Sequence, residues 1–197
     1  MQASASTSKL LKMIILALMG AISLVLFFLN FPLPFLPAYL KIDFSEVPAL
    51  IAALIFSPVA GIIVEGIKNL LYLVITGAGD PVGVVANFLA GILFILPVSY
   101  LYHRYKNVKG IVSGIVAGTI IMALAMSLLN YLVILPVYAW FMGMEEMNIE
   151  SVKRAAVLAG ILPFNILKGI IVGLLFLPLY TKLRSWIEQK SARFIAD

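Results

Sequence analysis

Residues 36–48 read LPAYLKIDFSEVP, and this polar stretch lies between two long apolar runs. Ser45 is a favoured N-cap residue for a helix that begins at Glu46, and Pro48 suits the first turn, where a missing N–H costs nothing. Glu46 also lies where the helix dipole favours a negative charge. We therefore expect an ordered loop that leads directly into a helix, either as an ordinary hairpin connection or as a lid over a site.

The composition of the chain indicates an integral membrane protein. Of its 197 residues, 63% are hydrophobic and 12% are charged, with a mean hydropathy of +1.11. A soluble domain has about 25% charged residues. We expect one all-α transmembrane domain over residues 1–197. The absence of cysteine excludes disulfides and cysteine metal ligands, and we expect no metal site.

Hydropathy and turn signals predict six transmembrane helices. The second is too short to cross a ~30 Å hydrocarbon core alone, so we expect the second and third to form a bent or partly re-entrant pair. We expect the first eight residues to be frayed and the polar tail, residues 181–197, to extend the last helix. The predicted helices cover residues 10–30, 46–56, 58–76, 82–102, 110–137 and 153–180.

The distribution of basic residues predicts the orientation of these helices. If both termini are cytoplasmic, nine Lys and Arg residues in the loops, tails and helix ends lie on the cytoplasmic side of the membrane and three lie on the external side. This asymmetry agrees with the positive-inside rule. The net charge of +5 is therefore explained by topology in a plasma membrane, and we expect no nucleic-acid partner. The inner residues are Lys9, Lys12, Arg104, Lys106, Lys109, Lys182, Arg184, Lys190 and Arg193, and the outer ones are Lys41, Lys153 and Arg154.

Three ionisable residues lie in the interior of the predicted helices, away from their ends. An ionisable group at membrane depth is costly unless it is paired, and it is a functional candidate by default. Glu65 and Lys68 are three residues apart on one helix, so they can form a structural ion pair. We favour this pairing over a substrate role, because a local pair is the least costly way to keep both charges.

Lys168 is the stronger candidate for a binding residue. It has no acid within one helical turn, and Asn165 lies three residues before it on the same helix face. Pro163, two residues before Asn165, removes one of the backbone hydrogen bonds of the helix. The alternative is that Lys168 pairs with Glu65 across helices. Asn130 and Asn87 are further buried amides that can bind a ligand or join helices, and for Asn87 we favour helix packing.

Small residues predict close helix packing at three places. Ala17 and Ala21 give the first helix a smooth face. Gly110, Gly114 and Gly118 do the same for the fifth, and Gly83, Asn87 and Gly91 for the fourth. Such faces let helices approach closely, within the fold or against a partner subunit. The sequence does not decide between these two roles.

Four segments together resemble a known family of transport proteins. They are LKIDFSEVPAL at residues 40–50, PVAG at residues 58–61, Glu65-x-x-Lys68-Asn69 and Asn165-x-x-Lys168. These segments closely resemble the riboflavin-binding S components (RibU type) of energy-coupling-factor (ECF) transporters, which are vitamin importers of the ABC class. The first segment is shared loosely with other S components, whereas N-x-x-K with the asparagine of the fifth helix points to riboflavin.

The resemblance implies a six-helix S-component fold with cytoplasmic termini and a vitamin site in the outer half of the membrane. It implies that helices four to six line the site and that the first loop covers it. The expected ligand-binding residues are Tyr39, Leu40, Phe44, Asn130, Asn165 and Lys168. The aromatic residues near the outer face mostly form an aromatic belt at the membrane interface, and some can stack on a flat ligand; they are Tyr39, Phe44, Tyr131, Tyr138 and Trp140.

The resemblance also implies partners. Ala17 and Ala21 would contact a transmembrane T component, which joins two cytoplasmic ATPases that hydrolyse ATP. The chain itself has no GxxxxGK[ST] phosphate loop. It would act as the high-affinity capture subunit for riboflavin, without a cofactor, a catalytic residue or an enzymatic activity.

The chemistry of riboflavin independently fits the candidate residues. Its flat apolar ring with a polar imide edge suits an apolar cavity that has a few amides and one cation. A self-sufficient secondary transporter of a small aromatic solute is an alternative, but those usually have an inverted repeat and intramembrane carboxylates, and here only Glu65 qualifies. An intramembrane enzyme is less favoured, because the only histidine, His103, lies in a basic loop.

Overall fold

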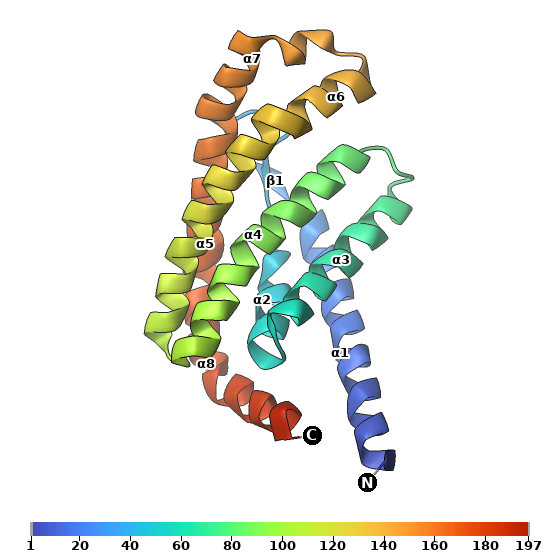
Figure 1. Cartoon of the computed structure of the whole chain (residues 1–197), viewed down its shortest axis with the longest axis vertical. Coiled ribbons are helices and arrows are strands. Elements are labelled where there is room, and N and C mark those ends of the chain that lie inside the picture. The colour runs from blue at the N-terminus through green and yellow to red at the C-terminus, as the bar shows by residue number, and fades with distance from the viewer. Residues whose placement is uncertain (1, 197) are drawn as a thin grey trace.

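The structure is a computed structural model that describes the backbone of residues 2–196 and is built almost wholly of helices (Figure 1). A two-residue antiparallel ladder, in which Phe31 faces Ile42, closes the loop after the first helix. The elements are α1 Gln2–Phe28, β1 Phe31–Pro32, β2 Lys41–Ile42, α2 Glu46–Ile55, α3 Pro58–Ile75, α4 Pro81–Tyr105, α5 Val108–Leu129, η1 Asn130–Ile134, α6 Leu135–Met142, η2 Glu145–Asn148, α7 Glu150–Ala155, η3 Ala156–Ile161 and α8 Leu162–Ala196.

These elements make six membrane-embedded helices, as predicted. The short π-helical segments η1 and η3 continue their neighbours, so α5 to α6 form one span and α7 to α8 another. Within the part of the chain that the structure describes, five helices are long and apolar enough to cross a membrane. The sixth is α2, whose ten residues are too few to cross alone. The predicted all-α, six-helix class is therefore confirmed.

Several predicted helix ends are wrong. The first helix begins at Gln2 rather than at residue 10, so its N-terminal part is helical rather than frayed. The fourth continues to Tyr105 instead of ending at residue 102. Lys106, which has a left-handed backbone conformation with φ of 47°, ends the helix. Asn107 immediately caps α5 by accepting a hydrogen bond from the Gly110 N–H at 2.8 Å. The predicted basic loop is thus reduced to a tight turn.

The central element of the bundle is α2. It contacts α1, α3, α4 and α8, and Ala49, Leu50 and Ala52 on it are fully buried. The chain reverses after Phe56, where Ser57 accepts a hydrogen bond from the Ala60 N–H at 3.4 Å and begins α3. This short helix, apolar apart from Glu46 in its first turn, is stable here because the surrounding helices cover its sides.

Small residues let the backbones of α4 and α5 approach closely. A Cβ atom on Gly114 would lie 2.6 Å from the Cα of Val98, and one on Gly118 would lie 2.7 Å from the Phe94 carbonyl oxygen. The predicted smooth face of the fifth helix is therefore confirmed as an internal packing surface. Such backbone contact is how small residues stabilise helix pairs in membranes.

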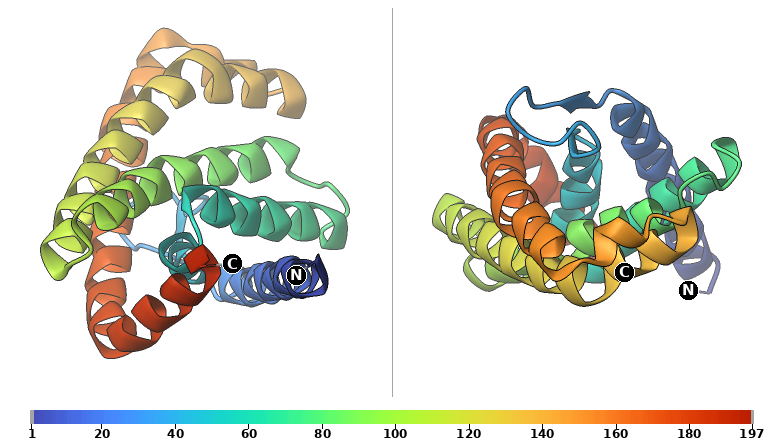
Figure 2. Two further views of the ribbon diagram at one scale, coloured as in Figure 1. Left: turned by 60° about the horizontal axis from the view of Figure 1, so that its bottom comes forward. Right: turned by 90° about the horizontal axis from the view of Figure 1, so that it is seen from above.

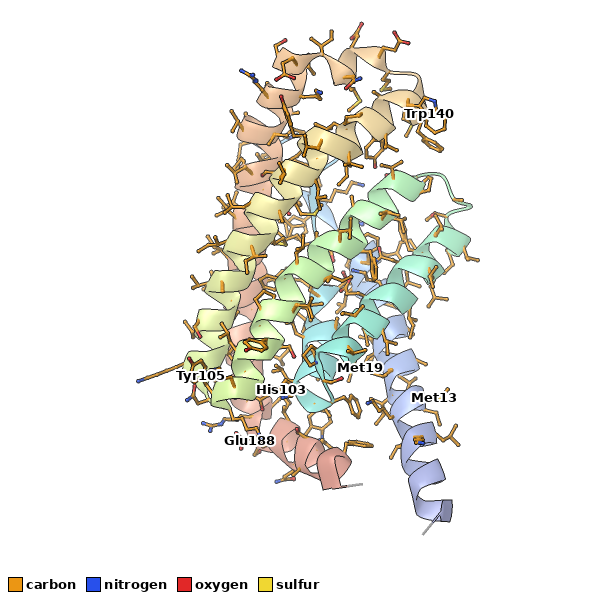
Figure 3. The ribbon with its side chains drawn as sticks, viewed as in Figure 1. Met13, Met19, His103, Tyr105, Trp140 and Glu188 are labelled. Atoms are coloured by element: carbon orange, nitrogen blue, oxygen red, sulfur yellow. The ribbon has the colours of Figure 1, made fainter. Side chains whose placement is uncertain are left out.

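Both termini lie at the same end of the molecule (Figure 1). His103, Tyr105 and Glu188 lie near this end, whereas Trp140 lies near the opposite end, beside the connection from α6 to α7 (Figure 3). The loop between α1 and α2 lies toward the end that carries Trp140.

We predict that Gly114→Ala destabilises the protein by about 1–3 kcal/mol, because its methyl group would overlap the backbone of α4. Gly66→Ala on α3 is the matched control, since its Cβ would have only an ordinary 3.8 Å contact with Phe88. Helix propensity predicts that this control is neutral or stabilising by up to about 1 kcal/mol. Thermal unfolding in detergent measures both, and equal stability of the two variants would contradict the packing assignment.

Candidate functional site

A cavity of about 530 Å³ opens between α4, α6, α8 and the first loop. This volume lies within the range of about 300–1,000 Å³ that is usual for small-molecule sites. Apolar side chains form most of its wall, and polar groups are few. Five of the six expected ligand-binding residues line it, namely Tyr39, Leu40, Asn130, Asn165 and Lys168.

Phe44 does not line the cavity. Its ring packs against Phe31, with the two centroids 6.3 Å apart, and against the hydrophobic core. Strand alternation explains its orientation, because Phe44 follows β2 and points opposite to Asp43, which does line the cavity. Any effect of Phe44 on a ligand therefore acts through the loop that it anchors.

Two amides present hydrogen-bonding groups to the cavity. The Nδ2 groups of Asn165 and Asn130 donate to the Ile161 and Met126 carbonyl oxygens, each at 2.8 Å and each four residues back. Each amide therefore keeps its oxygen and one N–H for a ligand.

Both amides lie next to π-helical turns. The segment η1 begins at Asn130, and η3 ends at Ile161, four residues before Asn165. Prolines at positions 136 and 163 follow the two segments, and proline cannot donate the hydrogen bond of a regular helix. Single π turns of this kind occur frequently at functional sites.

Lys168 is buried and has two carboxylate partners. Its Nζ lies 3.1 Å from Asp43 Oδ2 and 2.6 Å from Glu46 Oε1. Lys168 has no acid within one helical turn, as the sequence shows, but acids from other elements neutralise it, and the alternative that it pairs with Glu65 is wrong. The partners come from the first loop and from α2, and Asp43 is 125 residues away in the chain. Helical spacing alone could not identify them.

Glu65 and Lys68 are in direct contact, with Lys68 Nζ 2.6 Å from Glu65 Oε2, and both side chains are fully buried. Lys68 also donates a hydrogen bond to Ser45 Oγ at 2.9 Å. The Ser45 hydroxyl in turn contacts Asp43. The two ion-paired groups therefore form one charged cluster, which consists of Asp43, Glu46, Glu65, Lys68 and Lys168.

Ser45 has a different role from the one that the sequence predicts. Its side chain makes no capping hydrogen bond to α2. Instead the Ser45 N–H donates to Asp43 Oδ1 at 2.9 Å, which is an Asx turn, and Ser23 on α1 donates to the Ser45 carbonyl oxygen at 2.6 Å. The backbone of Ser45 is helical (φ −67°, ψ −19°) rather than extended as in an N-cap, and its hydroxyl donates to Asp43, so Asp43 orders the end of the loop.

Asp43 is an ionised group in a buried place. Burial raises the pKa of Asp43. The charges of Lys168 and Lys68 and the hydrogen bonds from Ser45 lower this pKa by more than burial raises it, so the net pKa lies below the ordinary value. The carboxylate and the ammonium of Lys168 are therefore both charged at neutral pH. Together they form a polar floor under an otherwise apolar cavity.

The first loop reaches across to the far side of the cavity. Figure 2 shows the connection between α1 and α2 extending toward the segment that leads into α8. Leu40 packs against an apolar cluster of Leu135, Val157 and Ile161. Tyr39 stands at the rim, with 60% of its surface exposed. The loop thus forms part of the cavity wall, in the position of a lid.

Several polar residues of the cavity wall were not among the ligand-binding residues selected from the sequence, and Asp80, Tyr138 and Asn87 are three of them. Asp80 and Tyr138 lie at the rim, where the Tyr138 hydroxyl is 2.7 Å from each carboxylate oxygen of Asp80. Asn87 lies on the inner wall, and its buried Oδ1 accepts no hydrogen bond from any residue that the structure describes. The spacing of Gly83, Asn87 and Gly91 was the only available signal, and it indicates close packing equally well.

The face of α1 that carries Ala17 and Ala21 lies outside the cavity. Both alanines are exposed, whereas Gly20 and Ser23, which are turned further around the helix, pack inward against Ile67 and Ser45. The small residues of the helix therefore divide into an internal packing face and an outward face.

Among the described residues, no three His, Cys, Asp or Glu side chains are grouped so that they could hold a metal ion. The polar groups of the cavity are instead amides, a paired lysine and paired carboxylates. They can hold a small organic molecule by hydrogen bonds.

Comparison with known proteins decides the family. The profile of the family "ECF transporter, substrate-specific component" matches residues 11–180. The chain belongs to the substrate-specific (S) components of ECF transporters.

Similar proteins align with this S component over nearly its full length. The riboflavin transporter FmnP of Bacillus subtilis (strain 168) is 49% identical over 189 residues, which cover 95% of this chain and 99% of the relative. The riboflavin transporter RibU of Staphylococcus aureus (strain TCH60) is 42% identical over 178 residues, covering 90% and 93%. A solved structure of the S component of a bacterial ECF transporter is 41% identical, with a TM-score of 0.77, covering 91% of this chain and 98% of that one.

We predict that Lys168→Met destabilises the ligand-free S component by about 3–5 kcal/mol, because it leaves Asp43 and Glu46 buried without a counter-charge. Arg184→Met is the matched control, since Arg184 pairs with Glu188 at the surface and such pairs contribute at most about 1 kcal/mol. Thermal unfolding in detergent compares them. Adding Asp43→Asn and Glu46→Gln to Lys168→Met should recover part of the loss, and similar small losses in both single variants would contradict the assigned ion pairs.

Proposed function

We propose that this S component binds riboflavin in its cavity and delivers it to the cytoplasm together with an energising module. The relatives that align over nearly the whole chain are named riboflavin transporters. The cavity has the size and the mixture of apolar wall and sparse polar groups that a flat heteroaromatic vitamin needs.

The arrangement of Asn130, Asn165 and Lys168 at one cavity is the observation that carries the proposal. The imide edge of the isoalloxazine ring has one N–H between two carbonyl oxygens, so it needs both a donor and acceptors. Each amide retains one N–H and its oxygen after the intrahelical bond. An ammonium group has three N–H donors, of which Lys168 directs two to carboxylates. The third can donate to a ring carbonyl or a ribityl hydroxyl.

The outward face of α1 is the proposed docking surface for a transmembrane T component. Ala17 and Ala21 are exposed there, and small residues let a partner helix approach closely. The T component would join two ATPases that hydrolyse the ATP, so this chain would need neither a cofactor nor catalytic residues.

The proposed location is the plasma membrane, with both termini in the cytoplasm. The positive-inside rule supports this orientation. The basic residues near His103 and at the C-terminal end of α8 gather at the end of the molecule that holds the termini (Figure 3). The cavity rim, with Asp80 and the connection from α6 to α7, would then face outward and receive riboflavin from outside the cell.

Two rival functions make different predictions. A self-sufficient secondary transporter of an aromatic solute would accumulate riboflavin without the T component, driven by an ion gradient. An intramembrane enzyme would convert a substrate without any partner. Membership in the S-component family favours a capture subunit over both.

We predict that the purified protein quenches riboflavin fluorescence, and that Asn165→Ala and Asn130→Ala each weaken binding about 5- to 150-fold. Each substitution removes a hydrogen bond from a buried site, a loss of about 1–3 kcal/mol. Asn148→Ala in the exposed connection after α6 is the control and should bind as the parent does. Unchanged affinity in both well-folded cavity variants would contradict the proposed site.

We predict that Ala17→Trp combined with Ala21→Trp abolishes riboflavin transport and association with the T component, while riboflavin binding persists. The bulky side chains would roughen the outward face of α1 without reaching the cavity. Val116→Trp, at an exposed position on α5, is the control and should support transport. Co-purification with the T component and uptake into cells measure the two effects. Normal assembly of the double variant would show that this face has another role.

A further inference from the structure

The carboxylate of Asp80 is held at the rim of the cavity by groups from two elements. Its Oδ1 accepts a hydrogen bond from the Gly83 N–H at 2.8 Å, so Asp80 caps the N-terminus of α4. The Tyr138 hydroxyl on α6 lies 2.7 Å from both carboxylate oxygens. Gly83 makes room for this arrangement, because a Cβ there would collide with Asp80 and with the Tyr138 hydroxyl. The carboxylate is therefore fixed in position.

The N-terminus of a helix ordinarily attracts a phosphate group, since its free N–H groups and its dipole favour an anion. Here the protein's own carboxylate occupies that position on α4. The phenol of Tyr138, the neighbouring hydrogen-bond donor, is also directed to Asp80. An incoming phosphate would thus meet a negative charge where a bare helix end would have offered a favourable place.

The rest of the cavity offers little compensation. Its charged lining residues are Lys41, Asp43, Asp80 and Lys168, and Lys168 is already paired with Asp43 and Glu46. Lys41 is the one lining cation without a carboxylate partner among the contacts of the described residues, and it is exposed to solvent. Near the rim, Glu145 and Glu146 lie between the lining residues Met144 and Met147. The cavity therefore lacks a buried free cation.

A phosphate group on the ligand would have to stay at the rim. A phosphate monoester carries about −1.5 to −2 charges at pH 7, and moving such a group away from water is very costly unless it is paired. The inner end of the cavity is buried, with Lys168 and Asn165 only 3% and 4% exposed. The rim, beside Asp80, is the one part where the phosphate could remain hydrated.

We propose that Asp80 is a specificity-determining residue that favours the uncharged vitamin over its phosphate monoester, riboflavin 5′-phosphate. This inference rests on the proposed function, namely that the cavity binds riboflavin. The ribityl end, which bears the phosphate in the ester, points to the rim and lies near the Asp80 carboxylate. Repulsion between the two anions then weakens binding of the ester relative to riboflavin.

Fluorescence-quenching titrations of the full-length protein with riboflavin and with riboflavin 5′-phosphate test this proposal. The measured quantity is the ratio of the two dissociation constants, ester over vitamin. Asp80→Asn removes the charge and keeps the shape, and Asp80→Ser removes the charge and keeps the ability to cap α4. We expect each variant to lower the ratio about tenfold or more, as the loss of one nearby charge in partly solvated surroundings implies.

Two controls separate the charge of Asp80 from other effects. Tyr138→Phe removes the hydroxyl without changing the charge, and Glu145→Gln removes an exposed carboxylate outside the cavity lining. Both should change the ratio less than threefold. A ratio that stays constant in well-folded Asp80→Asn and Asp80→Ser overturns the proposal, as does an equal fall in Glu145→Gln.

The salt dependence of the ratio of dissociation constants, measured on the parent protein alone, tests the proposal without any variant. High salt screens repulsion between partly exposed charges, so the ratio should fall as the salt concentration rises, and a ratio that does not fall overturns the proposal. Failure of the parent protein to bind riboflavin would instead contradict the proposed function itself. The two failures are therefore distinguishable.

Discussion

The ammonium group of Lys168 imposes the main constraint on this structure. A lysine that is 3% exposed within a bundle of apolar helices needs counter-charges, and these come from Asp43 and Glu46. Because the two acids lie at the end of the first loop and at the start of α2, the pairing brings this part of the chain against α8. The floor of the cavity is a direct consequence of this neutralisation.

The same contacts extend through most of the bundle. Asp43 is connected through Ser45 to Lys68, which pairs with Glu65 on α3, and Ser23 connects Ser45 to α1. The central helix α2 is thus held at its N-terminus by polar contacts and along its length by apolar packing. The cavity wall and the outward face of α1 are parts of one connected framework.

The sequence predicted the helices because each apolar run is long, and lipid permits few alternatives to a helix. It also selected Asn165 and Lys168, because residues three apart share a helix face. The partners of Lys168 were beyond prediction, since Asp43 is 125 residues away and only the tertiary fold brings it near.

Local rules failed where tertiary contacts compete with them. Ser45 has the chemistry of an N-cap, yet its hydroxyl turns to Asp43 and accepts a hydrogen bond from Lys68 instead. The contact between Asp80 and Tyr138 joins residues 58 positions apart, and Asp80 was not among the site residues predicted from the sequence. Phe44 was selected as a ligand-binding residue for its aromatic ring, whereas the direction in which its side chain points depends on the pairing of β1 with β2.

Hydrogen–deuterium exchange of the first loop tests most directly whether the ion pairs of Lys168 hold this loop in place. In the ligand-free parent protein the amides of residues 41–45 should exchange slowly, because the Ser45 N–H and the ladder between β1 and β2 are hydrogen-bonded. In Lys168→Met these amides should exchange much faster, while those of α4 and α5 stay protected. Unchanged protection of the loop in a folded Lys168→Met protein would contradict the account.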